Sequence, residues 1–418
     1  MSRSKIFVLC DYYLPGSKAG GPIHSLARTI ESHGDEFDFF LLTRDRDAGD
    51  QTAYRGVERD AWTRVGKAQV FYTADLSLGH LRRRILEISP AVVYLNSFFS
   101  VLSVRILLLS ALRLVPRFPV VLAPRGEFSP GALGIKRLRK WCYRRLAVVS
   151  GLCAEVIWQA SSEIERGQIE RVLGAGPGAG GRVIVAPDLS NATRRATRAG
   201  IARPEKSPGH ARFIFFSRIT PMKNLPFALD ALRGVDGCVE LDIYGPFEDA
   251  RHWRQCQKCI ASLPKNILVR YRGVIPGGEA VGVAARYHFF LLATQGENFG
   301  HAILEALTAG CPPVLSDRTP WREVSENSAG WCIPLEDRPL WRQTLQNCVR
   351  MDQETYQIHS QAAQQYAERW CRSTYANDCT AELFRTALAA RSDEGACPIH
   401  PNAGETRKAA ETASRARA

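Results

Sequence analysis

Glu297 and Glu305 stand eight positions apart, the first in a turn-like GENFG stretch and the second in a run rich in alanine and leucine. On a helix that begins near His301, Glu305 shares one stripe with His301 and Thr308. That stripe could simply face water. If the helix follows a strand, its first turns lie at a ligand-binding edge, where the Glu305 carboxylate could accept two hydrogen bonds from a ribose diol. Glu297 could meet another pair of hydroxyls.

The residues between the two glutamates lead into the helix through Asn298, Phe299 and Gly300. The first turn of a helix has unpaired backbone N–H groups and the positive end of the dipole, which together attract phosphate. Gly300 has no side chain and permits close approach of the backbone. The segment could therefore hold a sugar hydroxyl, a diphosphate and a ribose in series.

Two cations follow the strand-like segment FIFFS, Arg218 directly and Lys223 five positions later. A diphosphate carries about two negative charges, and a hydrogen bond to a charged group contributes roughly 1.5–3 kcal/mol. The spacing is equally compatible with two solvated surface cations. Gly245, in the turn after the next strand, could hold the edge of a base, although an ordinary turn is the simpler interpretation.

A glycine pair, Gly20 and Gly21, precedes the first helix of the chain and offers a further anion-binding helix N-terminus. The chain lacks GxGxxG at this point, which disfavours a standard NAD site. The 12 cysteines are scattered, and reduced thiols are expected. We expect neither a metal nor a cofactor.

The elements that must position these residues alternate between strand and helix in both halves of the chain. This alternation predicts an α/β protein with two Rossmann-like domains, whose parallel sheets are covered on both faces and flank a central cleft. A length of 418 residues also favours two domains. The predicted boundaries are a first domain over 1–190, a linker over 191–211, a second domain over 212–352, helices over 353–390 that pack back toward the first domain, and a disordered tail over 391–418.

The formal net charge is +13 and the pI about 9.3. Such a charge suits nucleic acid, an anionic membrane or phosphorylated substrates, and does not choose among them. Residues 135–145, IKRLRKWCYRR, carry six basic residues and no acid, interleaved with Leu138, Trp141 and Tyr143. This helix could lie on anionic lipid, at about 1 kcal/mol per cation, or it could be a solvated basic face. No recognised nucleic-acid module accompanies it.

The glycine pair, SRITPMKN, the YG turn and ENFGHAILEALTAGCPPVLSD together resemble the retaining nucleotide-sugar glycosyltransferases of family 4, which have the GT-B fold. The resemblance extends to about Arg385, and the Glu297–Glu305 spacing is its most specific element. The segments APRGEFSPGALGIKRLRK and TPWREV resemble the subgroup that builds bacterial exopolysaccharide, lipopolysaccharide O-antigen or capsule.

The resemblance implies roles for the residues above. Arg218 and Lys223 would bind the donor diphosphate and stabilise the leaving group. Glu305 would hold the nucleotide ribose, and Glu297 with the backbone of 298–300 would contact the transferred sugar and the phosphates. The acceptor hydroxyl would attack the face that the nucleotide leaves, the departing diphosphate could take its proton, and a metal is usually not required in this fold.

On the first domain, which would be the acceptor side, Gly21 would let its loop approach the diphosphate. Many relatives have a histidine where this chain has Asn96 and Ser97. Asn96, Arg125 and Glu127 are therefore the candidates for acceptor or sugar contacts. The alternative for Arg125 and Glu127 is a salt bridge at a loop.

These inferences predict an enzyme that moves a sugar from a nucleotide-diphosphate donor to a glycan or a polyprenyl-diphosphate-linked acceptor. An anionic membrane surface is a further candidate partner, and nucleic acid is not expected. The early Asp11 argues against a signal peptide, so a cytoplasmic location is expected, peripheral on the inner face of the plasma membrane if the basic helix binds lipid. The alternatives are another GT-B enzyme, an epimerase or a phosphorylase, or a non-catalytic scaffold that docks on a membrane.

Overall fold

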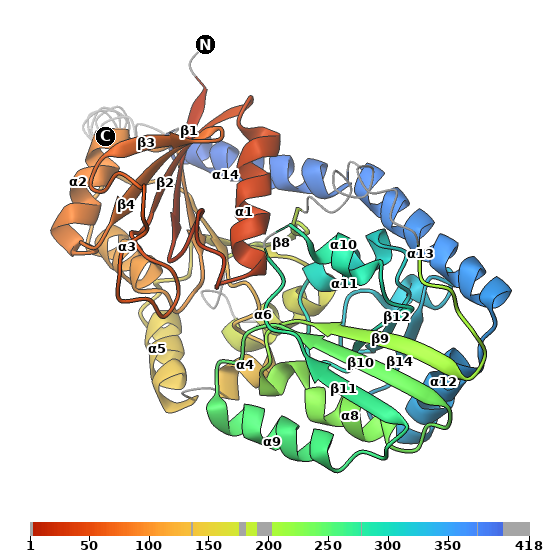
Figure 1. Ribbon diagram of the computed structural model, residues 1–418. Coiled ribbons are helices and arrows are strands. Elements are labelled where there is room, and N and C mark those ends of the chain that lie inside the picture. The colour runs from red at the N-terminus through yellow and green to blue at the C-terminus, as the bar shows by residue number, and fades with distance from the viewer. Residues whose placement is uncertain are drawn as a thin grey trace, which may run out of the picture.

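The computed structural model describes residues 3–134, 137–174, 181–189, 203–276, 278–373 and 375–395. These residues form two lobes, each built on one largely parallel sheet (Figure 1). The first lobe contains β1 to β8 and the second contains β9 to β14. The prediction of an α/β protein with two parallel-sheet units is confirmed.

The first sheet has eight strands in the order β3-β4-β2-β1-β5-β6-β7-β8, and only the β3–β4 pair is antiparallel. Its central strand β1 is buried over its last five residues because the sheet is covered on both faces. The strands are β1 Ser4–Cys10, β2 Phe37–Arg44, β3 Trp62–Val65, β4 Ala68–Thr73, β5 Val92–Asn96, β6 Val120–Ala123, β7 Val156–Ala160 and β8 Val183–Val185.

The helices of the first lobe begin where short polar side chains can accept hydrogen bonds from the first turn. Ser77, Ser100 and Ser162 cap α2, α3 and α6 in this way. The helices are α1 Gly21–His33, α2 Leu78–Ile88, α3 Val101–Ala111, α4 Pro130–Gly134, α5 Arg137–Val149 and α6 Glu163–Leu173. The apolar stretch over 92–115 is divided between β5 and α3, and within the described parts of the chain no helix is both long and apolar enough to cross a bilayer.

The second sheet has six strands in the order β11-β10-β9-β12-β13-β14, and all of its pairings are parallel. Its strands are β9 His210–Phe216, β10 Cys238–Tyr244, β11 Ile267–Tyr271, β12 Phe289–Leu292, β13 Pro313–Ser316 and β14 Trp331–Ile333. Its helices are η1 Pro221–Lys223, α8 Leu225–Leu232, α9 Ala250–Ala261, α10 Ala280–Ala284, α11 His301–Thr308, η2 Arg322–Val324 and α12 Arg338–Arg350.

The last two helices connect the lobes. α13 (Gln353–Arg372) packs on α11, and α14 (Tyr375–Gly395) returns to the first lobe, where it contacts α1, β5 and β6 (Figure 1). Phe384 of α14 is fully buried, and its ring lies 5.4 Å from that of Tyr94 and 5.6 Å from that of Phe37. α14 ends five residues beyond the predicted limit of 390. Residues 191–202 of the predicted linker and the predicted tail from 396 onward lie outside the described residues.

Parallel strands place their carboxyl ends at one edge of a sheet. The loops after β1, β5, β6, β7 and β8 therefore share one edge of the first lobe, and those after β9, β10, β12 and β13 share one edge of the second. The candidate residues lie at the ends of these strands, on these loops or in the first two turns of the helices that follow, and contacts described below join the two edges.

Replacement of Phe384 by alanine should make the chain easier to unfold, because it removes a fully buried aromatic ring from the contact between α14 and the core of the first lobe. The expected loss is about 3–5 kcal/mol in the free energy of unfolding, measured in urea. Y375A on the same helix is the matched control, since Tyr375 is 58% exposed. Equal losses for the two variants would contradict this account of α14.

Candidate functional site

Three strand-end loops of the second lobe are joined by hydrogen bonds. The carbonyl of Met222, in the loop after β9, accepts from the backbone N–H of Gln295 at 2.8 Å and from Oγ1 of Thr294 at 3.0 Å. The N–H of Glu297 donates to the carbonyl of Arg318, in the loop after β13, at 2.9 Å. The loops after β9, β12 and β13 are therefore bonded to one another, and they are called the clamped loops below.

Lys223 and Glu297 form an ion pair within this unit. Nζ of Lys223 donates to Oε2 of Glu297, and the two side chains are only 12% and 17% exposed. The sequence predicted one as a diphosphate ligand and the other as a sugar ligand. The structure brings the two side chains together, so each neutralises the charge of the other at a place that little water reaches.

Arg218 lies at the outer side of the same edge. Its side chain is half exposed and donates from one terminal nitrogen to Oε1 of Glu248 at 2.7 Å. The loop that carries it is tied to the loop after β10, because the N–H of Ile219 donates to the carbonyl of Pro246 at 2.8 Å. Arg218 thus belongs to the same edge as Lys223 but to its solvent side.

Gly245 has a packing role in this arrangement. Its φ is +135°, and an added Cβ would lie 1.9 Å from the carbonyl oxygen of Ser217. The glycine is required because the backbone that precedes Arg218 passes directly against it. A contact of Gly245 with a base stays a prediction.

The start of α11 has the geometry expected from the sequence. Gly300 precedes the helix with φ +87°, and an added Cβ would lie 2.8 Å from Cδ1 of Ile303. Phe299 is buried, with its ring 5.8 Å from that of Trp321 and 5.2 Å from that of Trp370, and its carbonyl accepts from the Trp321 indole. The Phe299 side chain therefore anchors the loop, while the N–H groups of the first helical turn remain at the edge.

The stripe on α11 does not form a solvated face. Thr308 is 4% exposed, and the His301 side chain is 18% exposed. Glu305 lies between them and is half-buried. The interpretation of this stripe as water-facing is therefore wrong.

One contact between the lobes joins Asn298 to Glu165 of α6. The Asn298 side-chain amide donates to Oε1 of Glu165 at 2.7 Å, and the N–H of Gly126 donates to the same oxygen at 2.7 Å. Oε2 accepts from the N–H and Oγ of Ser161 at 2.8 and 2.6 Å. Burial of the carboxyl raises the pKa of Glu165, which is 1% exposed.

A second contact between the lobes surrounds His301. Its Nε2 lies 3.3 Å from Oγ of Ser25 and 4.0 Å from Oδ2 of Asp188, both in the first lobe. An added Cβ on Gly21 would lie 2.7 Å from Cδ2 of His301, so this glycine makes room for the imidazole. Gly20, with φ +71°, opens onto free space at the start of α1. Burial lowers the pKa of His301 to about 4, and the ring is neutral at pH 7.

Arg125 is bound within the first lobe. It forms an ion pair with Asp188 and donates to Oδ1 of Asn96 at 2.9 Å and to the Tyr94 hydroxyl at 2.8 Å. Its side chain is 8% exposed, and the nearby Asp188 carboxylate raises the pKa of Arg125 against the effect of burial. The salt-bridge alternative holds for Arg125, which positions Asp188 beside His301.

Glu127 is also bound within the first lobe. It accepts from the N–H groups of Phe98 and Phe99 at 2.6 and 3.2 Å and from Oγ of Ser97 at 2.6 Å. Burial raises the pKa of this carboxyl. Asn96 keeps one free group at this edge, since its Nδ2 is buried with no hydrogen-bond partner among the described residues. Acceptor contacts by Asn96, Arg125 and Glu127 stay predictions.

Sequence reasoning missed Glu165, Asp188 and the interlobe position of His301. Glu165 and Asp188 each follow a predicted strand by a few residues, at the same edge as Arg125. The rule that ligands bind beyond strand carboxyl ends could have selected both. The pattern Ser162-x-x-Glu165 also fits a capping box, which would account for both residues without a ligand.

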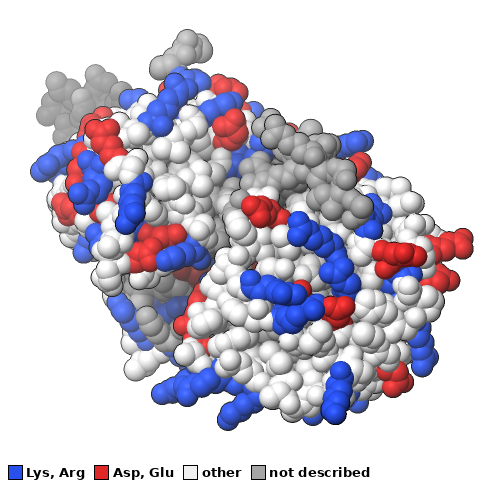
Figure 2. Space-filling view, viewed as in Figure 1, with Lys and Arg blue, Asp and Glu red and all other residues white. Residues whose placement is uncertain are grey.

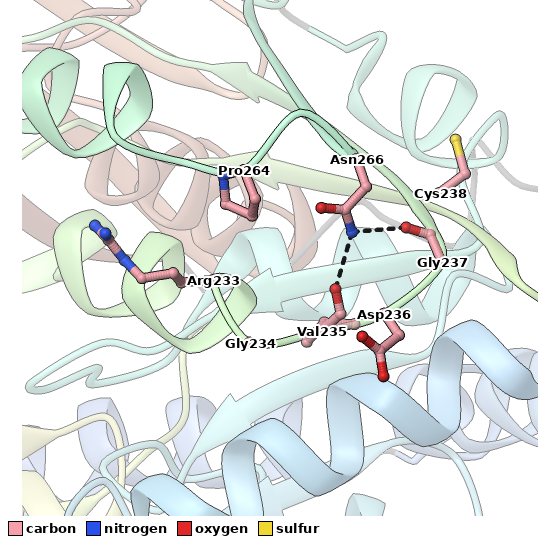
Figure 3. Close-up of a pocket in the computed structure, with 8 residues that line it drawn as sticks. All are labelled: Arg233, Gly234, Val235, Asp236, Gly237, Cys238, Pro264 and Asn266. Atoms are coloured by element: carbon pink, nitrogen blue, oxygen red, sulfur yellow. Dashed lines mark hydrogen bonds between the residues drawn. The ribbon is translucent and has the colours of Figure 1, made fainter.

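A shallow pocket of about 530 Å³ lies at the amino ends of β10 and β11, on the sheet edge opposite to the clamped loops (Figure 3). There the Asn266 amide donates to the carbonyls of Val235 and Gly237 at 3.0 and 2.8 Å. The pocket is lined by Arg233, Gly234, Val235, Asp236, Gly237, Cys238, Pro264 and Asn266. It contains none of the predicted site residues.

Comparison with known proteins gives a domain and a fold. Residues 210–350 match the family described as glycosyl transferases group 1. No curated protein matches. Sucrose-phosphate synthase from Thermosynechococcus elongatus superposes with a TM-score of 0.71 at 13% identity, over 93% of this chain and 100% of that one. HepE from Anabaena, solved with UDP and glucose, has a TM-score of 0.63 at 17% identity, over 93% of this chain and 100% of that one.

WaaG, a glycosyltransferase involved in lipopolysaccharide biosynthesis, has a TM-score of 0.61 at 12% identity, over 90% of this chain and 99% of that one. These similarities show the GT-B fold. Together with the domain match over 210–350, they support a glycosyltransferase.

Acid should destabilise the protein through His301. The imidazole titrates near pH 6.5 in the unfolded chain and near pH 4 in the folded one, so the unfolded state binds more protons between these values. The free energy of unfolding should therefore fall as the pH drops through this window, by about 3 kcal/mol from this group. Urea unfolding of the parent and of H301Q at each pH measures the difference, and an equally steep fall in H301Q would refute the assignment.

Proposed function

We propose that this glycosyltransferase, whose second lobe carries the group 1 domain, is a retaining enzyme that uses a nucleoside-diphosphate sugar. Its acceptor is a glycan or a lipid-linked glycan in the synthesis of a cell-surface polysaccharide. The observation that carries the proposal is the clamped set of loops that presents Lys223, Glu297 and the start of α11 at one edge.

The donor diphosphate is placed between Lys223 and the first turn of α11. The ammonium group and the positive end of the α11 dipole both favour negative charge, and Gly300 supplies the left-handed backbone (φ +87°) that leads the chain into the helix. Arg218 adds a second cation from the solvent side of the edge. Glu305, half-buried one turn along α11, is placed to hold the ribose hydroxyls.

In this proposal the anomeric carbon–oxygen bond to the diphosphate breaks while an acceptor hydroxyl bonds to the same face of the sugar. The departing phosphate oxygen takes the hydroxyl proton, so no protein nucleophile is needed. Negative charge grows on the diphosphate in the transition state, and Lys223 stabilises it there more than in the ground state. Glu297 keeps the ammonium in position and offers its oxygens to sugar hydroxyls.

The named relatives support parts of this proposal. HepE was solved with UDP and glucose, and WaaG acts in lipopolysaccharide biosynthesis, which agree with a UDP-sugar donor and a cell-surface acceptor. Sucrose-phosphate synthase shares the same fold, so the fold alone does not select the acceptor. The acceptor class rests on the sequence resemblance of APRGEFSPGALGIKRLRK in the first lobe and TPWREV in the second.

Replacement of Lys223 by alanine should weaken the binding of UDP, GDP or ADP, whichever the parent binds, by about 10- to 150-fold, the equivalent of one charge-assisted hydrogen bond. Sugar transfer should fall at least as much. Thermal unfolding with nucleotide measures the loss, since a ligand at about 100 times its dissociation constant stabilises the parent by about 2.7 kcal/mol.

K265A is the matched control for K223A, because Lys265 is an exposed lysine between α9 and β11, outside the clamped loops. It should bind nucleotide like the parent. A parent protein that responds to none of the three nucleotides would favour the non-catalytic scaffold. Unchanged transfer in K223A would refute the diphosphate assignment.

Replacement of Glu305 by glutamine should reduce discrimination between a nucleoside diphosphate and its 2′-deoxy analogue. The parent should prefer the ribose form by about tenfold or more, since a carboxylate that loses its hydroxyl partner forfeits a charge-assisted hydrogen bond. Isothermal titration of both ligands with both proteins measures this. Equal weakening of the two ligands in E305Q would place Glu305 away from the ribose.

A further inference from the structure

The helix α5 stands almost free of the rest of the molecule. Of its thirteen residues, Ala147 alone is buried. It is attached by Tyr143, whose ring lies 4.9 Å from that of Phe98, and by Lys140, whose Nζ lies 4.9 Å from the centre of the Phe99 ring and donates to the carbonyl of Ala132 at 2.7 Å. The opposite side of α5 therefore faces outward.

That outward side is apolar. Leu138, Trp141, Leu146 and Val149 are 75%, 51%, 64% and 77% exposed. Their spacing of three, five and three residues places them on one side of a helix with 3.6 residues per turn. A water-facing helix normally presents polar residues there, and an exposed row of large apolar side chains marks an interaction surface.

Cations flank the apolar row, and Arg145 lies within it. α5 contains five basic residues and no acid, and among the described residues no carboxylate lies within ion-pair distance of its arginines. The five are Arg137, Arg139, Lys140, Arg144 and Arg145. Figure 2 shows blue side chains over α5 at the lower left of the molecule. The surface is thus complementary to a partner that is both anionic and apolar.

We propose that α5 docks on an anionic lipid bilayer, lying in the plane of the headgroups with its apolar row toward the acyl chains. Leucine, valine and tryptophan side chains enter the boundary between headgroups and chains, and each cation adds attraction to anionic lipid. A nucleic acid would use the cations but not the apolar row. A second copy of α5 would bring four arginines against four without an acid between them.

The position of α5 connects this surface to the interlobe edge. Residues 135 and 136, which precede α5, lie outside the described residues, but the α4 segment before them touches the second lobe. An added Cβ on Gly131 would lie 3.1 Å from Sδ of Met222, the neighbour of Lys223. Figure 1 shows α5 extending from the first lobe beside α4. A bilayer on α5 would thus lie near the proposed acceptor side, which suits a lipid-linked acceptor if the proposed function holds.

Sedimentation with vesicles tests the docking surface. The parent should sediment with vesicles that contain phosphatidylglycerol and remain in solution with phosphatidylcholine alone. Neutralisation of three exposed cations, R137Q/R139Q/R145Q, should lower the partition coefficient on the order of a hundredfold, from about fivefold for each cation. The apolar variant L138Q/W141Q/L146Q keeps its cations but cannot insert, so its binding should fall even at low salt, where attraction to the charged headgroups is strongest.

Two matched variants control for charge and for apolar surface elsewhere. The triple variant K265Q/R342Q/R350Q removes three exposed cations of the second lobe. The triple variant L268Q/V274Q/I358Q removes three exposed apolar side chains there. Both should sediment like the parent. Sedimentation that is absent for the parent, or unchanged in the α5 variants, would overturn the proposal, as would a dimer in solution that the apolar variant dissociates.

Nucleotide binding separates this inference from the proposed function. L138Q/W141Q/L146Q should keep the parent's thermal shift with nucleotide, since α5 contributes no residue to the clamped loops. Loss of vesicle binding with the nucleotide response intact supports the docking helix. A joint loss of both would show a general folding defect and overturn the assignment of this face.

Discussion

The ion pair between Lys223 and Glu297 is the interaction on which the second lobe's edge depends. Both side chains are largely removed from water, where an unpaired charge would be costly. Glu297 therefore permits a cation to be held at this place before any anion arrives. The loops that carry the two residues are joined by backbone hydrogen bonds through Met222 and Arg318, so the geometry of the pair is set by three strand ends together.

The described interlobe contacts around the start of α11 are polar. Asn298 meets Glu165, and His301 meets Ser25 and lies near Asp188. These residues immediately surround the start of α11, so any rotation of one lobe against the other changes the surroundings of the proposed phosphate site first. Interfaces of this kind between domains commonly permit relative motion. α14, which follows the second lobe in the chain, is anchored in the core of the first lobe around Phe384. This apolar contact can keep the lobes attached while the polar contacts break and re-form.

The first lobe uses its own charged residues to build its edge. Arg125 and Glu127 make their hydrogen bonds to Asp188, Tyr94, Asn96 and the loop after β5, and so shape the surface that faces the second lobe. α5, by contrast, exposes Leu138, Trp141, Leu146 and Val149, and its arginines make no ion pair within the described chain. One lobe therefore combines a tightly bonded edge with an exposed apolar and basic helix.

The amino-acid sequence by itself determined the two α/β lobes, the strand ends that carry the candidate residues, and the helix start at His301. Those features follow from local patterns, namely short β-branched strands, helix-forming runs and glycines before helices. The pairing of Lys223 with Glu297, the reach of Asn298 to Glu165 and the burial of His301 against Gly21 were decided only by the tertiary structure. They join residues 74, 133 and 280 positions apart, and no local pattern encodes which distant side chains meet once two sheets are brought edge to edge.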